Sequence, residues 1–128
     1  MQYALLIYET PEDFASRSVD QKDEPYMGAW RAYYRSMAEA GVYAGGQPLD
    51  IPETGTTVLQ TGGKRQIQDG PYANTKEQLG GFILVELPSL DAALEWASRC
   101  PAAVRGAVEV RPLGSSVHLR VTSTGADS

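Results

Sequence analysis

Residues 69–87 read DGPYANTKEQLGGFILVEL, and this stretch decides the fold because a charged turn runs directly into a strongly apolar strand. The turn begins with Asp69, Gly70 and Pro71. Asp can bond its own downstream backbone, Gly accepts a positive φ, and Pro fixes φ. Residues 80–87 are dense in apolar side chains, which predicts a buried strand. Polar loops beside a rigid strand commonly carry binding residues, so the segment is also the first place to look for a site.

The rest of the chain changes its hydrophobic period several times. An apolar and aromatic run over residues 3–8 predicts a first strand. Over residues 25–40, Met27, Trp30 and Tyr34 fall on one helical face, which predicts a core-packing helix ended by Gly41 in the left-handed conformation. A loop with a short helical turn is predicted over 12–24, and a strand over 42–49. Gly62 and Gly63 predict the turn of a hairpin with strands 56–61 and 64–68. A helix capped by Ser89 and ended by Pro101 and a strand over 108–113 follow. The pairs Gly45-Gly46 and Gly80-Gly81 are interpreted as bulge or turn positions.

This order of elements predicts an α+β fold. Without the inserted β-hairpin it is the split βαβ, or ferredoxin-like, arrangement. Two helices on one face leave the other face of the sheet apolar and uncovered, and an identical subunit related by two-fold symmetry is the most economical cover. The sequence therefore predicts one domain over residues 1–113 that forms a homodimer. Residues 114–128 are small and polar and predict a partly flexible C-terminal tail with an extra strand over 117–121.

Composition excludes several classes of function. The chain has 128 residues and a net charge of −5, and no run of Lys and Arg is present, so no nucleic-acid or anionic-membrane partner is expected. The apolar start is too short for a signal peptide, and no window reaches the length of a membrane span, which predicts a cytoplasmic protein. The one cysteine, Cys100, suits a reducing compartment. We expect it to be a buried packing residue rather than a reactive thiol beside Arg99.

Metal and cofactor motifs are missing from the sequence. The single histidine, His118, has no Cys/His cluster around it, so no metal site is predicted. No P-loop, nucleophile elbow or dinucleotide fingerprint occurs, so no cofactor is predicted either.

Residues 69–77, DGPYANTKE, resemble the DGPFAETKE signature of the YCII-related (YciI-like, DGPF-domain) proteins. Tyr72 stands where Phe is usual, and Asn74 stands where Glu is usual. Similar segments lie at 5–9, 41–42, 80–82, 90–97 and 108–112, so the resemblance covers residues 1 to about 113. It implies a bacterial protein whose two ferredoxin-like subunits form a dimeric α+β barrel, and a link to an extracytoplasmic-function sigma factor pathway. The His–Asp pair of the wider group has no counterpart here, because His118 lies beyond the shared region.

The motif itself admits two interpretations. In the structural one, Asp69 satisfies backbone amides, and Thr75 with Gln78 forms a capping box for a following turn. In the functional one, Asp69 is a general base or a ligand anchor, Tyr72 donates a hydrogen bond, and Lys76 binds an anionic group.

Other candidates accompany this motif. Glu77 lies beside Lys76, and Tyr8 and Glu9 end the first strand. Arg111 lies on the last strand, where it can pair with neighbours of Glu109 or with a bound carboxylate. Arg31 and Tyr34 lie one turn apart on the first long helix and form a secondary pair.

Three functions remain open at this level. The first is a small-molecule site near residues 69–76 with acid–base chemistry, which predicts a pocket near Asp69. The second is a non-catalytic regulatory or interaction protein in the sigma-factor pathway. The third is a divergent relative of dimeric-barrel enzymes that act on aromatic compounds, which rests on analogy of fold.

Overall fold

A computed structural model describes residues 1–17 and 24–114 of the chain. Its elements are β1 (Gln2–Glu9), α1 (Pro11–Ala15), α2 (Pro25–Ala40), β2 (Tyr43–Pro48), η1 (Pro52–Thr54), β3 (Thr56–Thr61), β4 (Lys64–Asp69), β5 (Gln78–Glu86), α3 (Leu90–Ser98), η2 (Pro101–Ala103) and β6 (Ala107–Pro112). The predicted strand over 117–121, His118 and the second part of the predicted 12–24 loop lie outside the described residues.

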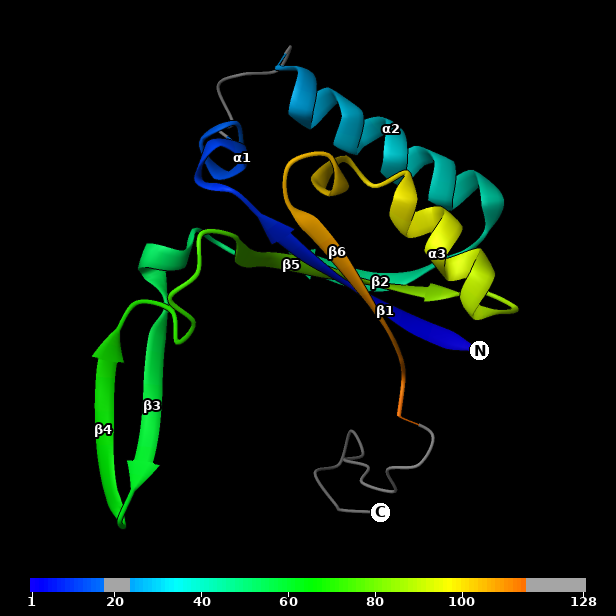
Figure 1. Cartoon of the computed structure of the whole chain (residues 1–128). Helices are drawn as coiled ribbons and strands as arrows, with labels where there is room; N and C mark the ends of the chain where they lie inside the picture. The colour runs from blue at the N-terminus through cyan, green and yellow to red at the C-terminus, as the bar shows by residue number, and fades with distance from the viewer. Residues whose placement is uncertain (18–23, 115–128) are drawn as a thin grey trace.

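Four strands form an antiparallel sheet in the order β2-β5-β1-β6. Leu5 at the centre of β1 faces Ile83 on one side and Val110 on the other. The helices α2 and α3 lie on the same face of this sheet (Figure 1). The predicted ferredoxin-like α+β fold with an inserted hairpin is therefore confirmed.

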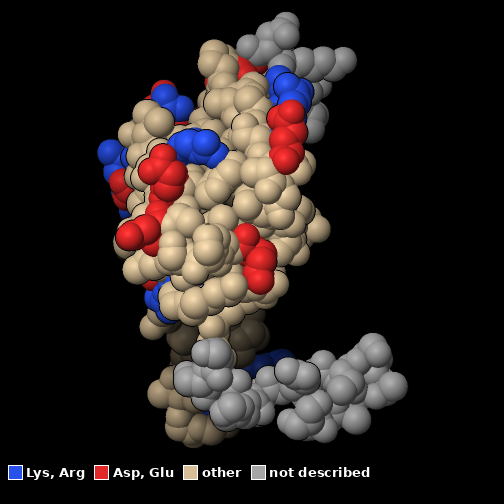
Figure 2. Space-filling model, turned by 90° about the vertical axis from the view of Figure 1, so that its right-hand side faces the viewer, with Lys and Arg blue, Asp and Glu red and all other residues tan. Residues whose placement is uncertain are grey.

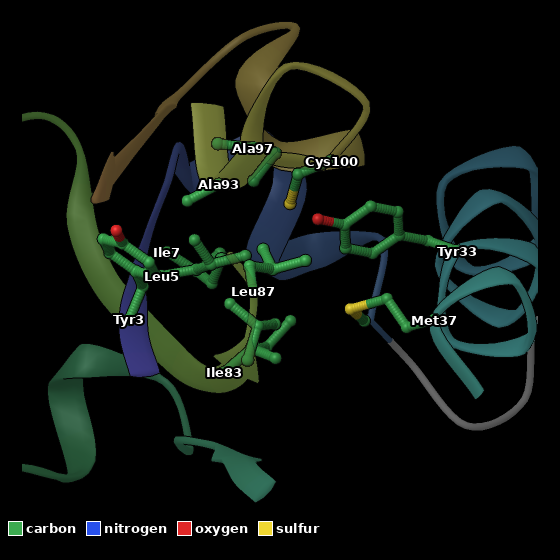
Figure 3. Packing of buried hydrophobic residues seen from close by; sticks show 12 residues of the cluster. Tyr3, Leu5, Ile7, Tyr33, Met37, Ile83, Leu87, Ala93, Ala97 and Cys100 are labelled. Carbon is green, nitrogen blue, oxygen red and sulfur yellow. The ribbon is translucent and has the colours of Figure 1, made fainter. Parts of the chain in front are cut away.

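Alternation along β1 decides which side chains enter the core. Tyr3, Leu5, Ile7 and Glu9 are buried under the helices, whereas the residues between them are half-buried on the opposite face. In Figure 3, Tyr33 and Met37 of α2 point toward the side chains of the sheet and of α3. The cluster joins twelve buried residues: Tyr3, Leu5, Ile7, Tyr33, Met37, Ile83, Val85, Leu87, Ala93, Ala97, Cys100 and Ala102. The expectation that Cys100 is a buried packing residue is confirmed.

The ends of the helices follow local chemistry. Gly41 ends α2 with φ 70°, and the Ser89 side chain accepts a hydrogen bond from the backbone N–H of Ala92 at the start of α3. The helix α3 ends at Ser98 rather than at Pro101. Pro101 disfavours the helical conformation for the residue before it, and Cys100 is accordingly extended (φ −68°, ψ 133°).

The inserted hairpin β3–β4 projects away from the body of the molecule (Figure 1). Gly62 and Gly63, with φ of 59° and 77°, form its tight turn as predicted. At its base, the N–H of Gly70 donates to the carbonyl of Gly55 over 2.7 Å, and the Thr57 hydroxyl donates to the carbonyl of Gly70 over 2.9 Å. These bonds join the two arms of the hairpin and close its base.

Charged side chains of both signs are interspersed on the face that Figure 2 shows. In the described residues, no helix combines the length and the apolar character needed to cross a membrane.

Candidate active site

The motif residues lie at the surface. Asp69 ends β4 and is exposed, and so are Tyr72, with 73% of its surface accessible, and Lys76. Across residues 1–17 and 24–114, no hydrogen bond or ion pair involves the Asp69 carboxylate. The predicted use of Asp69 to satisfy backbone amides is therefore absent from this part of the chain.

The predicted capping box of Thr75 and Gln78 is wrong. The Thr75 hydroxyl donates to the carbonyl of Glu77 over 2.7 Å, and the Gln78 amide donates to the carbonyls of Ala73 and Thr75 over 2.8 Å each. Gln78 is the first residue of β5, so no helix follows. The apolar run after the motif favours a strand, and the two side chains brace a loop instead.

Some of the predicted site residues do come together. Tyr8, Tyr72 and Glu77 line a hollow of about 540 Å³ between the motif and the loop that contains η1. Asp69 does not line it, and Lys76 lines an adjacent hollow with Phe14 and other residues. The hollow that Tyr8, Tyr72 and Glu77 line lies on the side of the sheet to which Tyr8 points.

Arg111 is apart from this group. Its Nε donates to the Glu109 carboxylate over 2.6 Å, and this hydrogen bond raises the pKa of Arg111. Arg111 therefore pairs with Glu109 itself rather than with the neighbours of Glu109 that the sequence suggested.

Glu9, the neighbour of Tyr8, points to the helix-covered face and is only 3% exposed. The Tyr26 hydroxyl on α2 donates to its Oε2 over 2.5 Å, and Arg17 Nη1 donates to its Oε1 over 3.2 Å. Burial raises the pKa of Glu9, while the bonds from Tyr26 and Arg17 oppose that rise. Burial, and then the bond to Glu9, raise the pKa of Tyr26, so its hydroxyl stays protonated and donates.

A β-bulge makes room for the Glu9 carboxylate. Ile7 pairs with Gly81 but Tyr8 pairs with Leu79, so Gly80 is the extra residue of the bulge. A Cβ at Gly80 would lie 1.9 Å from Glu9 Oε1. Any side chain at this position would therefore collide with the carboxylate, and the predicted bulge at the glycine pair is confirmed.

The segment around α1 fixes Arg17 against Glu9. The buried Asp13 closes a capping box with Thr10 and accepts bonds from Arg105 Nε and Nη2 over 2.8 and 2.7 Å. Arg17 follows Ser16, the C-cap of α1, and donates through Nη2 to the carbonyl of Leu49 over 2.5 Å. The Asp13–Arg105 ion pair thus joins α1 to the turn before β6, and the Glu9–Arg17 ion pair joins the segment after α1 to β1. The Arg17–Leu49 hydrogen bond joins the same segment to the loop after β2.

Glu9 and Arg17 open onto a cavity of about 310 Å³ between α2 and the sheet. Trp30 and Tyr34 of α2 line it together with Tyr43 of β2. The rings of Trp30 and Tyr34 lie 5.6 Å apart, and those of Tyr34 and Tyr43 lie 5.9 Å apart. The remaining lining residues are Ile7, Met27, Gly46, Gln47, Pro48, Gly80, Gly81 and Phe82. An apolar hollow with a few convergent polar groups is the common form of a ligand site.

Sequence reasoning identified only part of this cavity. It named Glu9 beside Tyr8 and placed Trp30 on the core-packing face, but it missed Arg17 in the cavity and Tyr26, the second donor to Glu9. The available signal was the period of two along β1, which places an acid on the same face as Leu5 and Ile7. No local pattern connects Tyr26 or Arg17 to that acid.

In the described residues, no group of three or more His, Cys, Asp or Glu side chains could hold a metal ion. Cys100 is not a nucleophile at neutral pH, because burial raises the pKa of its thiol to about 12.

Comparisons with known proteins give the family. An uncharacterized protein of Rhizobium meliloti (strain 1021) is 37% identical over 115 residues, which cover 88% of this chain and 92% of that protein. A solved structure of 5-chloro-2-hydroxyhydroquinone dehydrochlorinase from Burkholderia phenoliruptrix AC1100, in complex with 2,5-dihydroxybenzoquinone, is 17% identical, with a TM-score of 0.49 over 88% of this chain and 92% of that chain. The family model of the YCII-related domain matches residues 1–115. The chain therefore belongs to the YCII-related domain family.

Proposed function

We propose that the protein binds a small organic molecule in the cavity between α2 and the sheet, and that Glu9 exchanges a proton with it. One observation carries the proposal: an almost fully buried carboxylate forms part of the wall of a cavity that aromatic side chains also line. Burying a carboxylate costs free energy, and the fold meets this cost with two donors and a bulged glycine. Such an arrangement suits a site that holds a proton acceptor in a fixed position.

The environment of Glu9 also suits acid–base chemistry. A general acid or base works best when its pKa lies near the working pH, and burial moves the pKa of Glu9 in that direction. Tyr26 and Arg17 hold the carboxylate in one orientation. The acid–base role that the sequence suggested for Asp69 is therefore better supported at Glu9.

The test is a small-fragment screen followed by amide and indole NMR. The two tryptophans provide an internal control, because Trp30 lines the cavity whereas Trp96 packs on α3 against Tyr33 and Arg99. Ligands of the proposed site should shift the Trp30 indole and the Gly80 amide and leave the Trp96 indole unchanged.

Glu9→Gln is the matched variant for the proton step. It should keep the fold and abolish the titration of the cavity carboxylate, which 13C NMR of the glutamate side chains measures in the wild type. Fragments that shift only residues around Tyr8 and Tyr72 would favour the motif hollow instead. The absence of any ligand would favour the regulatory alternative, a non-catalytic interaction protein of a sigma-factor pathway.

We also propose that the protein is a homodimer. The face of the sheet opposite α2 and α3 carries Leu6 and Leu84, which stay half-buried in the single chain. The projecting hairpin carries two further exposed apolar side chains, Val58 and Ile67. Light scattering coupled to size-exclusion chromatography should give twice the mass of the chain, and a monomer at micromolar concentrations would contradict the proposal.

A further inference from the structure

We propose that the ligand of the Glu9 cavity is an uncharged, planar aromatic compound with an N–H or O–H donor. This inference rests on the proposed function, since it names the chemical class that the same site would take. Three features of the cavity support it: its charge balance, the shape of its wall and the free acceptor capacity of Glu9.

The charges of the cavity are already balanced. Of the described residues that line it, Glu9 and Arg17 carry charge, and they form an ion pair over 3.2 Å. The second Nη of Arg17 donates to the carbonyl of Leu49. An anionic ligand would meet the Glu9 carboxylate beside the guanidinium, and a cationic one would meet the guanidinium beside the carboxylate. Either would leave its own charge without a full partner in a partly desolvated site, which is unfavourable.

The wall of the cavity is aromatic and continuous. Trp30 and Tyr34 are tilted by 33°, and Tyr43 meets Tyr34 edge to face. Aromatic pairs favour offset stacking and edge-to-face contacts, so a flat ring fits this wall better than a branched aliphatic molecule. The volume of about 310 Å³ lies at the lower end of known ligand pockets, which favours one or two fused rings.

Glu9 keeps acceptor capacity for a ligand. Each carboxylate oxygen has two lone pairs, and within the described residues Oε1 and Oε2 each receive one hydrogen bond, from Arg17 and Tyr26. The carboxylate can therefore accept a further bond from a donor in the cavity. Hydrogen bonds to charged groups contribute more than neutral ones, so this donor should be a main determinant of affinity.

Four probes of similar shape test the class by NMR titration. Indole is neutral and has an N–H donor, indene has the same shape without the donor, indole-2-carboxylate is an anion, and N-methylquinolinium is a cation. Indole should bind about tenfold or more tightly than each of the others, which corresponds to about 1.4 kcal/mol. Its binding should shift the Trp30 indole and the Gly80 amide, with Trp96 as the unaffected reference.

A pair of variants locates the donor contact. Glu9→Gln should reduce the preference for indole over indene by several-fold, whereas Glu77→Gln, in the other hollow, should leave it unchanged. Equal affinities for indole and indene, or tighter binding of a charged probe at Trp30, would overturn the ligand class and leave the proposed site intact. If none of the four probes shifts Trp30 or Gly80, the ligand class is overturned, and a fragment screen that also finds no cavity ligand would overturn the proposed function itself.

Discussion

Two neighbouring residues, Tyr8 and Glu9, separate two very different regions of this molecule. Glu9 points to the helix-covered side, where its carboxylate accepts bonds from Tyr26 and Arg17. The missing side chain of Gly80 leaves room for this carboxylate. Tyr8 faces the side of the motif and the hairpin, where side chains are exposed and bonds are mostly local. A single step along a strand reverses the face, because side chains alternate with a period of two.

The comparison shows that the segment that marks the family and the segment that concentrates buried polar groups are different. The motif at residues 69–77 is a braced loop at the base of a projecting hairpin. Glu9 on β1, Arg17 after α1 and Tyr26 on α2 meet at the Glu9 carboxylate, and Glu9 and Arg17 line the cavity. Buried polar groups need hydrogen-bond partners, and here distant parts of the fold supply them. Exposed polar groups can bond to water and need no such partners.

The largest expected effect compares the same truncation in the two regions. Ile83→Ala removes a core side chain that is 1% exposed and should lower the free energy of unfolding by about 2–5 kcal/mol. Ile67→Ala, on the hairpin with 55% exposure, should change it by about 0.5 kcal/mol or less in the single chain. Urea denaturation of both variants measures the difference. A larger loss for Ile67→Ala at high protein concentration would show that another molecule covers the hairpin.

The next largest effect should come from Gly80→Ala. Its Cβ would approach Glu9 Oε1 to 1.9 Å and Phe14 Cε1 to 3.2 Å, so the free energy of unfolding should fall by about 1–3 kcal/mol. Gly28→Ala is the control, because its Cβ would meet nothing closer than 3.8 Å, and Ala in a helix is favoured over Gly by about 0.5–1 kcal/mol. Glu9→Ala removes the colliding carboxylate, so the Glu9→Ala, Gly80→Ala double variant should lose less than the sum of the single losses. Strict additivity would contradict the steric explanation.

The fold could be predicted from sequence because its determinants are local. The spacing of Met27, Trp30 and Tyr34 indicates α2, Ser89 indicates the start of α3, and the Gly62-Gly63 pair indicates the hairpin turn. The cavity could not be predicted because Glu9 meets Tyr26 across 17 residues of chain, and only the folded chain brings them together. The [ST]-x-x-[EQ] pattern at Thr75 misled because a capping box requires a helix, and the residues after it form a strand.

A smaller effect should appear in the pH dependence of stability. Burial raises the pKa of Glu9 above 4.5 in the folded state, so the folded protein holds this proton when the unfolded chain has lost it. The contribution of Glu9 to stability is therefore present below pH 4.5 and is lost as the pH rises through the folded pKa. A glutamine cannot titrate, so the stability of Glu9→Gln does not fall with this proton. Relative to the wild type, its free energy of unfolding should rise by at most about 1.4 kcal/mol per pH unit within that window.

Denaturant titrations of the two proteins between pH 4.5 and pH 8 measure this gain. Glu95→Gln on the exposed face of α3 is a matched control and should stay parallel to the wild type. A difference between Glu9→Gln and the wild type that shrinks with rising pH would mean that the donors, rather than burial, dominate the environment of Glu9.

The smallest expected effect concerns the residue that the sequence placed first. Asp69 is exposed, and its carboxylate has no hydrogen bond or ion pair with any described residue, so Asp69→Asn should change the free energy of unfolding by about 0.5 kcal/mol or less. It should also leave the indole-induced shifts of Trp30 unchanged, because Asp69 does not line the Glu9 cavity. The pairing of this variant with Glu9→Gln separates the two regions directly. If Asp69→Asn reduces ligand binding more than Glu9→Gln does, the motif side of the sheet holds the site, and a second subunit must complete it there.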